Sequence, residues 1–333
     1  MNIFITGVAG FLGSHLADYF ISKGHNVIGC DNLMGGYIDN VNKDVTFYNY
    51  ECNDLNSMIK ITKQVDIIYH CAASAHEGLS SFSPYYISKN TVDASVSVFT
   101  AGIVNKVKKI IFCSSMARYG DQTLPYSENM QPKPVDTYGI GKVAAEQYLI
   151  NLCSTHGVNY TIAVPHNIIG PRQKYDDPYR NVVSIMINLM LQKRQPIIYG
   201  DGNQKRCFSY VDDCVISLYQ MAIEPITNSQ IYNIGPDEEF ITINELSEII
   251  ANKLKFNLNP IYHRDRPLEV KYSYCSSDKI KKDLKYNIFT PLDIGIENTI
   301  EYIKKRGVRD FKYHIDLEIL NKNTPSTWKE KLF

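Results

Sequence analysis

A phenol and an amine four residues apart are the first candidates for chemistry in this chain. Tyr138 and Lys142 stand in the run Tyr-Gly-Ile-Gly-Lys. Residues at i and i+4 lie on one face of a helix, so both side chains can point into the same pocket. A free phenol titrates near pH ~10, and an ammonium group beside it stabilises the phenolate and lowers that pKa. The spacing therefore predicts a phenol that exchanges a proton with an alcohol.

A glycine-rich turn near the start of the chain predicts a phosphate site. Residues 2–6 have the pattern of a short buried strand, and residues 14–23 have that of a helix. Three glycines fall between them: Gly7, Gly10 and Gly13. They permit a tight turn and close approach of backbone N–H groups to a pyrophosphate, next to the positive end of a helix.

The second predicted strand indicates which dinucleotide binds. Residues 26–30 form this strand, and Asp31 follows it directly. A carboxylate at that place accepts hydrogen bonds from the ribose hydroxyls and repels a 2′-phosphate. The sequence therefore predicts NAD as cofactor in preference to NADP.

Strand and helix patterns alternate through the first half of the chain. The further strands are predicted at 65–70, 109–113 and 160–164, and the helices at 90–104 and 138–153. This alternation predicts an α/β fold with a doubly wound parallel (Rossmann) sheet. Such sheets bind ligands at the carboxyl ends of their strands. We expect the residues that directly follow the strands to line one crevice: Gly7, Asp31, Ala72, Ser115 and Asn167.

The pattern changes after residue 170. Helices are predicted at 181–192, 213–222, 243–254 and 277–284, with a strand at 259–263. We expect a smaller α/β substrate lobe that is interleaved with the first. The predicted division is an NAD-binding domain at 1–167, a substrate lobe mainly at 168–303 with segments near 208–235 returning to the Rossmann core, and a C-terminal surface extension at 304–333.

Composition restricts the class of protein and its partners. The chain has 333 residues, of which 44% are hydrophobic, enough for one large domain or two lobes. Basic and acidic residues number 35 each, so charge gives no reason to expect nucleic acid or a membrane as partner. No apolar run approaches the ~20 residues of a membrane span. The eight cysteines contain no C-x-x-C pair and are predicted to be reduced, which favours a cytoplasmic location.

Taken in order, the motifs resemble a known family over nearly the whole chain. It is the extended short-chain dehydrogenase/reductase family, in particular its NAD-dependent nucleotide-sugar epimerases and dehydratases, and among these the UDP-hexose 4-epimerases. The matching motifs are Gly7-x-x-Gly-x-x-Gly13, Asp31-Asn32-Leu33, His70-Cys-Ala-Ala73, Asn90, Ser114-Ser115, Tyr138-x-x-x-Lys142, Asn167-x-x-Gly-Pro171, Arg206-x-Phe208 and Arg266-Pro267.

The resemblance implies roles for individual residues. It makes Ser115, Tyr138 and Lys142 catalytic. It assigns NAD to Gly7, Gly10, Phe11, Leu12, Gly13, Asp31, Asn32, Glu51, Cys52, Ala72, Ala73, Asn90, Tyr138 and Lys142. Glu51 departs mildly from the Asp that the family often has beside adenine. The implied substrate contacts are Ser115, Met116, Asn167, Arg206, Arg266 and Ser273, and the arginines suit a diphosphate because of their permanent charge and forked donors.

The residues after Ser115 bear on the reaction. Related dehydratases resemble one another in carrying an Asp-Glu pair there, and the 3,5-epimerase type carries a Cys at the second of those positions. This chain has Met116 and Ala117, which cannot exchange protons, so oxidation and reduction at the sugar C4 remain. The resemblance implies a 4-epimerase of UDP-glucose and UDP-galactose. It adds UDP-GlcNAc and UDP-GalNAc, because Ser273 is small where strict enzymes have Tyr.

Other hypotheses remain open. A 4-ketoreductase, an epimerase of a uronic or heptose nucleotide sugar, and a non-catalytic NAD-binding regulator are the alternatives, although such regulators typically lose the Tyr/Lys pair. His76 and Glu77 either face water or touch the sugar, and Arg118 is expected in a surface or interdomain salt bridge. The pair Asp176-Asp177 lacks companion ligands in the sequence, so no metal is expected. The expected partners are a small nucleotide sugar and a second copy of the chain in a homodimer.

Overall fold

Seven parallel strands form the central sheet, in the order β11-β6-β5-β4-β1-β2-β3. The computed structural model describes residues 1–237, 240–287 and 290–333. The strands are β1 Asn2–Thr6, β2 Asn26–Cys30, β3 Thr46–Tyr48, β4 Ile67–His70, β5 Lys109–Cys113, β6 Asn159–Pro165 and β11 Gln230–Ile234. Sheets that are covered on both faces carry near-continuous apolar strands, as here. The predicted Rossmann sheet is confirmed.

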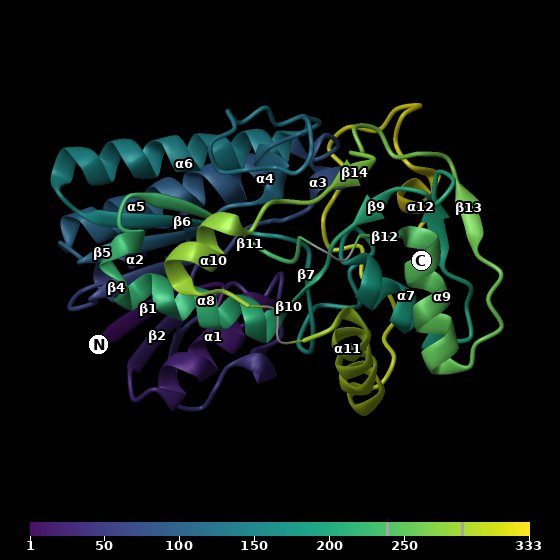
Figure 1. The fold of residues 1–333 in the computed structure, drawn as a ribbon, viewed down its shortest axis with the longest axis horizontal. Coiled ribbons are helices and arrows are strands. Elements are labelled where there is room, and N and C mark those ends of the chain that lie inside the picture. The colour runs from purple at the N-terminus through teal and green to yellow at the C-terminus, as the bar shows by residue number, and fades with distance from the viewer. Residues whose placement is uncertain (238–239, 288–289) are drawn as a thin grey trace.

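Helices cover both faces of this sheet (Figure 1). On one face lie α1 (Phe11–Ser22), α8 (Val211–Ile223) and α10 (Asp278–Leu284), packed around buried Phe20 and Tyr232. On the other lie α2 (Leu55–Ile61), α5 (Ala94–Val104) and α6 (Thr137–His156), packed around buried Phe99 and Phe112. The two apolar layers hold the strand ends in fixed positions.

A second lobe is built mainly from later segments. Its three main helices share one core: α7 Val182–Leu191, α9 Ile243–Leu254 and α11 Leu292–Arg306. Short strands complete it: β8 Ile197–Tyr199 with β13 Ile261–His263, β9 Lys205–Arg206 between β12 Ile241–Thr242 and β14 Tyr272–Ser273, and β7 Ile168–Ile169 with β10 Ser209–Tyr210.

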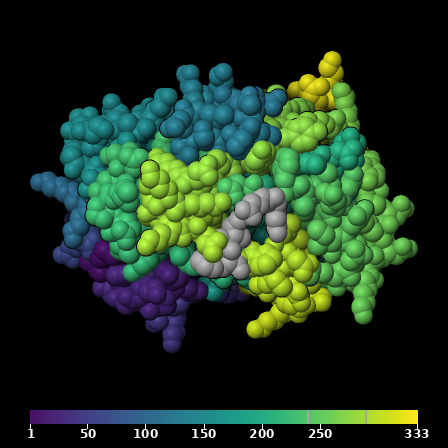
Figure 2. Space-filling view, in the orientation of Figure 1, coloured from purple at the N-terminus to yellow at the C-terminus, as the bar shows by residue number. Residues whose placement is uncertain are grey.

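The chain passes between the lobes more than once. From β10 it returns through α8 to β11 at the edge of the central sheet, and α10 packs on β11. In the space-filling view, the lime-green segment around α10 lies against the blue and purple first half (Figure 2). Among the described residues, none of the helices has the length and apolar character that a membrane crossing requires.

Several boundaries differ from those predicted. The helix at 243–254 is confirmed, whereas α1 begins at Phe11 and α6 extends to His156. The short helices α3 (Glu77–Ser80) and α4 (Pro84–Ser88) were not predicted, because a single turn leaves no periodic pattern. The predicted division at 303/304 falls inside α11.

The C-terminal segment after α11 packs against the body of the protein. Trp328, in the short helix α12 (Ser326–Lys329), is buried and lies edge-on to the rings of Phe82 and Tyr179, at centroid distances of 6.0 and 5.7 Å. Ile315 is buried in the same cluster. The prediction of a surface extension is therefore wrong for these residues, because their apolar side chains cover α3 and the loop before α7.

This packing predicts a large cost for truncating Trp328. Trp328→Ala should lower the free energy of unfolding by about 3–5 kcal/mol, since burial of the indole is lost and a cavity remains. Urea unfolding followed by circular dichroism measures this change. Leu320→Ala is the matched control in the same segment, because Leu320 is 61% exposed. Equal stability of the Trp328 variant and the wild type would show that the segment contributes nothing to the fold.

Candidate active site

Two adjoining cavities lie at the carboxyl edge of the central sheet. The cofactor cavity runs along the glycine turn past Asp31 to Tyr138 and Lys142. The lobe cavity lies between the lobes and is lined by residues that include Glu77. Five residues line both cavities: Ala75, Ile168, Gln173, Arg180 and Asn181. A ligand in one cavity is therefore adjacent to a ligand in the other.

The glycine turn has the geometry of a phosphate cradle. Gly7 has φ +72°, and a Cβ on Gly13 would lie 2.2 Å from the carbonyl oxygen of Gly7. Only glycine therefore allows this turn to close. Helix α1 begins beside it without a side-chain cap, so its first N–H groups remain for a ligand. Phe11 and Leu12 line the cavity here, as predicted.

Asp31 is fixed by the backbone of the turn. Its Oδ2 accepts a hydrogen bond from the N–H of Ala9 at 3.0 Å, and its Oδ1 accepts one from Leu33 at 2.7 Å. Burial raises the pKa of Asp31, and these hydrogen bonds oppose the shift. Each carboxylate oxygen keeps a lone pair for a ribose hydroxyl.

The remaining predicted cofactor residues surround the same cavity. Asn32 Nδ2 donates to Glu51 Oε2 at 3.1 Å, and Asn90 Nδ2 donates to the carbonyl of Tyr86 at 2.9 Å. The others on the wall are Cys52, Ala72 and Ala73. Glycine turn, uncapped helix and ribose-facing carboxylate together fit the adenosine diphosphate half of NAD.

The three predicted catalytic residues come from neighbouring elements. Ser115 is the second residue after β5, and its Oγ accepts a hydrogen bond from the N–H of Ala117 at 3.2 Å. Tyr138 and Lys142 lie in the first turns of α6, which Asp136 caps by accepting from the N–H of Gly139 at 2.8 Å. All three catalytic side chains are buried.

The pKa of Tyr138 shifts in the opposite direction to the prediction. Burial raises the pKa of its phenol, and the carboxylate of Glu77 raises it further. A hydrogen bond with Ser115 acts in the opposite direction. The predicted lowering of this pKa by Lys142 is therefore not observed in the protein without ligands, because desolvation of the phenolate outweighs the nearby positive charges.

Lys142 is the cation that the site buries. Its Nζ donates to the carbonyl of Cys113 at 2.7 Å and lies 4.6 Å from the centroid of Phe112 and 5.8 Å from that of Tyr138. Burial lowers the pKa of Lys142 to about 8. The ammonium is thus held beneath the phenol by a backbone oxygen.

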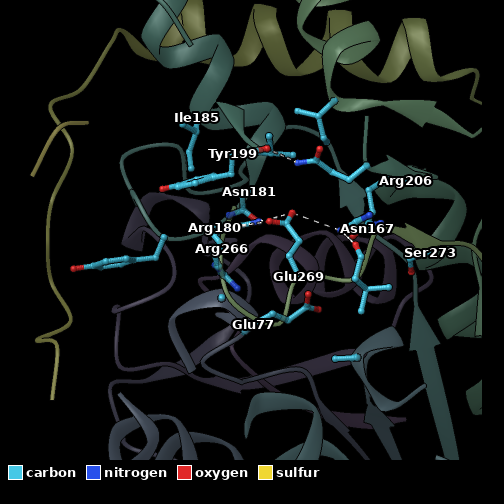
Figure 3. A pocket seen from close by; sticks show the side chains of 18 of the residues that line it. Glu77, Asn167, Arg180, Asn181, Ile185, Tyr199, Arg206, Arg266, Glu269 and Ser273 are labelled. Carbon is cyan, nitrogen blue, oxygen red and sulfur yellow. Dashed lines mark hydrogen bonds and ion pairs between the residues drawn. The ribbon is translucent and has the colours of Figure 1, made fainter. Parts of the chain in front are cut away.

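Five of the six predicted substrate residues line the lobe cavity, and Ser115 is the exception. Met116 and Ser273 line it, as does Asn167, whose Nδ2 donates to the carbonyl of Cys207 at 3.0 Å. Arg206 and Arg266 face Glu269, which lies between them (Figure 3). Arg266 holds Glu269 with two hydrogen bonds of 3.0 and 2.9 Å. Glu269 therefore offsets one positive charge of the arginine pair, and the carboxylate of Glu77 in the same cavity also acts on both arginines.

The side chains of Glu77 and His76 lie in different surroundings, although the two residues are consecutive. Glu77 lies in the lobe cavity with its carboxylate accessible (Figure 3). The protein around it raises its pKa to about 7, mainly by desolvation and then by the charge of Asp136. His76 is buried, and its Nε2 lies 2.9 Å from Oδ2 of Asp177. Glu77 thus faces the ligand space, while His76 serves the protein interior.

Asp177 also attracts His314 from the C-terminal segment, at 3.8 Å. The ligand atoms of His76, Asp177 and His314 lie within 4.8 Å of one another, a grouping that could hold a metal ion. Motif spacing does not reveal these companions of Asp177, because the three residues are far apart along the chain.

Arg118 forms a salt bridge, but it does not lie at the surface or between the lobes as predicted. It is buried in a two-pronged pair with Glu146, with distances of 3.0 Å from Nε to Oε1 and from Nη2 to Oε2. Glu146 also accepts a hydrogen bond from Ser114. Arg118 therefore has a structural role beside the carboxyl end of β5.

Comparison with known proteins agrees with this geometry. The profile of the NAD dependent epimerase/dehydratase family matches residues 3–235. The chain belongs to this family. It is therefore an enzyme of an NAD-dependent epimerase family.

Individual relatives are similar over nearly their full length. A putative UDP-glucose 4-epimerase of Methanocaldococcus jannaschii is 34% identical, with 92% of this chain and 99% of the relative covered. The structure of a Thermotoga maritima UDP-glucose 4-epimerase with UDP-glucose is 32% identical, with a TM-score of 0.86 and coverage of 92% and 99%. A UDP-N-acetylglucosamine 4-epimerase of Methanobrevibacter ruminantium is 30% identical, with a TM-score of 0.83 and the same coverage.

The charge of Glu77 predicts a change in pH dependence. Ionised Glu77 raises the pKa of Tyr138, so Glu77→Gln should lower that pKa. The acidic limb of kcat/KM against pH, which reports deprotonation of the base, should move to lower pH by roughly one unit. Steady-state rates between pH 7 and 11, where Glu77 is ionised, measure it.

Glu248→Gln removes an exposed carboxylate from α9 and should leave the profile unchanged. If the acidic limb stays in place or moves upward in Glu77→Gln, Glu77 does not act on the phenol.

Proposed function

We propose that this protein is a nucleotide-sugar 4-epimerase that interconverts UDP-glucose and UDP-galactose, and also UDP-GlcNAc and UDP-GalNAc. One observation carries the proposal: Tyr138 lines the cofactor cavity, and only Met116 and Ala117 follow Ser115 before Arg118. Neither of these exchanges protons with sugar carbons. Oxidation followed by reduction at C4 remains, and the named 4-epimerases among the relatives support it.

The proposed mechanism assigns each step to residues of the chain. Tyr138 takes the proton of the sugar 4-hydroxyl, and Ser115 donates a hydrogen bond to the same oxygen as charge develops. NAD, when bound, supplies the acceptor and later the donor of the hydride. Lys142 holds the nicotinamide ribose and steadies the phenolate. Arg206 and Arg266 hold the diphosphate while the 4-keto sugar turns its other face.

The alternatives differ in measurable ways. A 4-ketoreductase would consume a reduced cofactor, whereas an epimerase recycles its NAD. A non-catalytic regulator would bind NAD without turnover. The burial of Tyr138 and Lys142 beside the cavity, with Ser115 hydrogen-bonded to Tyr138, argues against it. An epimerase of uronic sugars would act on a nucleotide sugar that carries a carboxylate, whereas a hexose epimerase would act on a neutral sugar.

The homodimer and the cytoplasmic location remain predictions. The exposed side chains Tyr85, Ile140 and Tyr148 lie on the neighbouring helices α4 and α6 and supply apolar surface for a dimer contact. Cys153, Cys214 and Cys275 are buried free thiols, which fits a reducing compartment. Sedimentation equilibrium of the purified protein measures its oligomeric state.

The first prediction of the proposal concerns the proton carrier. Tyr138→Phe keeps the ring but removes the hydroxyl, so turnover should fall by roughly two to four orders of magnitude. Binding of NAD should remain, because the cofactor contacts of the glycine turn are unchanged. Wild type and variant are incubated with UDP-, GDP-, CDP- and dTDP-hexoses, and the products are identified by NMR. Near-wild-type turnover in Tyr138→Phe would refute the mechanism.

The second prediction concerns the sugar at C2. Ser273 lines the lobe cavity, so Ser273→Tyr should fill the space that an acetamido group needs. The kcat/KM for UDP-GlcNAc should fall by roughly tenfold to hundredfold relative to that for UDP-glucose. Ser273→Ala removes the hydroxyl without adding volume and should leave the ratio unchanged. Equal losses for both sugars in Ser273→Tyr would exclude Ser273 as the gate.

A further inference from the structure

Few cationic side chains line the cofactor cavity to balance the pyrophosphate of NAD. Among its described lining residues, the acids are Asp31 and Glu51, and the side chains of Lys and Arg are Lys142 and Arg180. Lys142 is tied to the carbonyl of Cys113 beneath Tyr138, at the opposite end from the glycine turn. A pyrophosphate carries two negative charges, and Arg180 is the remaining cation that could balance them.

Arg180 lies close to the phosphate cradle, although it comes from the loop before α7. A Cβ on Gly35 would lie 3.8 Å from Nη2 of Arg180. The next residue, Gly36, packs directly on the turn, because its Cβ would lie 2.1 Å from the carbonyl oxygen of Ala9 and 2.6 Å from the nitrogen of Gly10. The guanidinium therefore stands beside the turn that is shaped for phosphate.

The guanidinium of Arg180 is positioned by a carboxylate, but its Nε–H group donates no hydrogen bond among the described residues. Its Nε is buried without a hydrogen-bond partner among the described residues, and it lies 3.8 Å from Oδ2 of Asp177 in a loose ion pair. Asp177 is itself fixed by His76 at 2.9 Å and by the N–H of Tyr179, which donates to Oδ1 at 2.9 Å. The carboxylate thus positions the arginine and leaves its forked N–H groups for an anion.

We propose that Arg180 binds the pyrophosphate of NAD and so reaches from the substrate lobe across the opening of the cofactor cavity. Guanidinium and phosphate form two-pronged, charge-assisted hydrogen bonds, which complement the backbone N–H groups of the turn. Arg180 also lines the lobe cavity, and Asn181 beside it begins α7. Bound NAD therefore fixes the loop that forms one wall of the sugar site.

Binding of NADH to the ligand-free protein tests this without any sugar. NADH affinity is measured by fluorescence titration, and ADP-ribose affinity by calorimetry. In Arg180→Gln both should weaken about tenfold to hundredfold, the range for loss of charge-assisted hydrogen bonds. The dependence of NADH affinity on salt should become shallower, because one ion pair is lost. Arg180→Lys keeps the charge without the fork and should recover part of the affinity.

Two controls separate binding from folding. Arg194→Gln removes an arginine that lies outside both cavities and should bind NADH like the wild type. Thermal melting of each variant detects any loss of the fold, and only folded variants are compared. Unchanged NADH and ADP-ribose affinity in Arg180→Gln would overturn the proposal, and so would weakened UDP binding with NADH binding intact, which would assign Arg180 to the substrate. Neither result depends on whether the protein is a 4-epimerase.

Discussion

Parallel pairing of the central strands is the constraint on which the site depends. Because β1, β2, β4, β5 and β6 all run in one direction, their carboxyl ends meet at one edge of the sheet. The glycine turn, Asp31 and Ser115 each follow one of these strands, so residues far apart in sequence line adjoining cavities. Helices packed on both faces fix the strands, and the buried apolar layers thereby fix the positions of the polar residues.

Desolvation sets the charges at this edge. Tyr138 and Lys142 are both buried, and burial disfavours phenolate and ammonium alike. Glu77 adds a carboxylate that titrates near neutrality and opposes ionisation of the phenol. Both effects favour the neutral form of the Tyr138 phenol.

The second cavity exists because the chain is interleaved. Its walls come from α3, from the loop before α7 and from β14, three segments that are far apart along the chain. Asp177, in the loop before α7, contacts His76, which immediately precedes α3. It also attracts His314 from the C-terminal segment. The C-terminal segment is held in place by Trp328 in the apolar cluster with Phe82. The sugar site is therefore shaped by residues at the end of the chain as well as by the family motifs.

The sequence by itself determined the local features. Tyr138 and Lys142 share a helix face because of their spacing, and the glycines of the first turn are required by its geometry wherever the turn packs. Each of these depends on neighbours in the chain, so each leaves a readable pattern. The tertiary structure alone decided the charge of Tyr138, the burial of Arg118 and the position of Arg180. These depend on sums over surrounding atoms and on partners such as His76 and Asp177, which are 101 positions apart. Periodicity and motif spacing carry no information about such contacts, because burial and charge pairing arise only when distant segments pack.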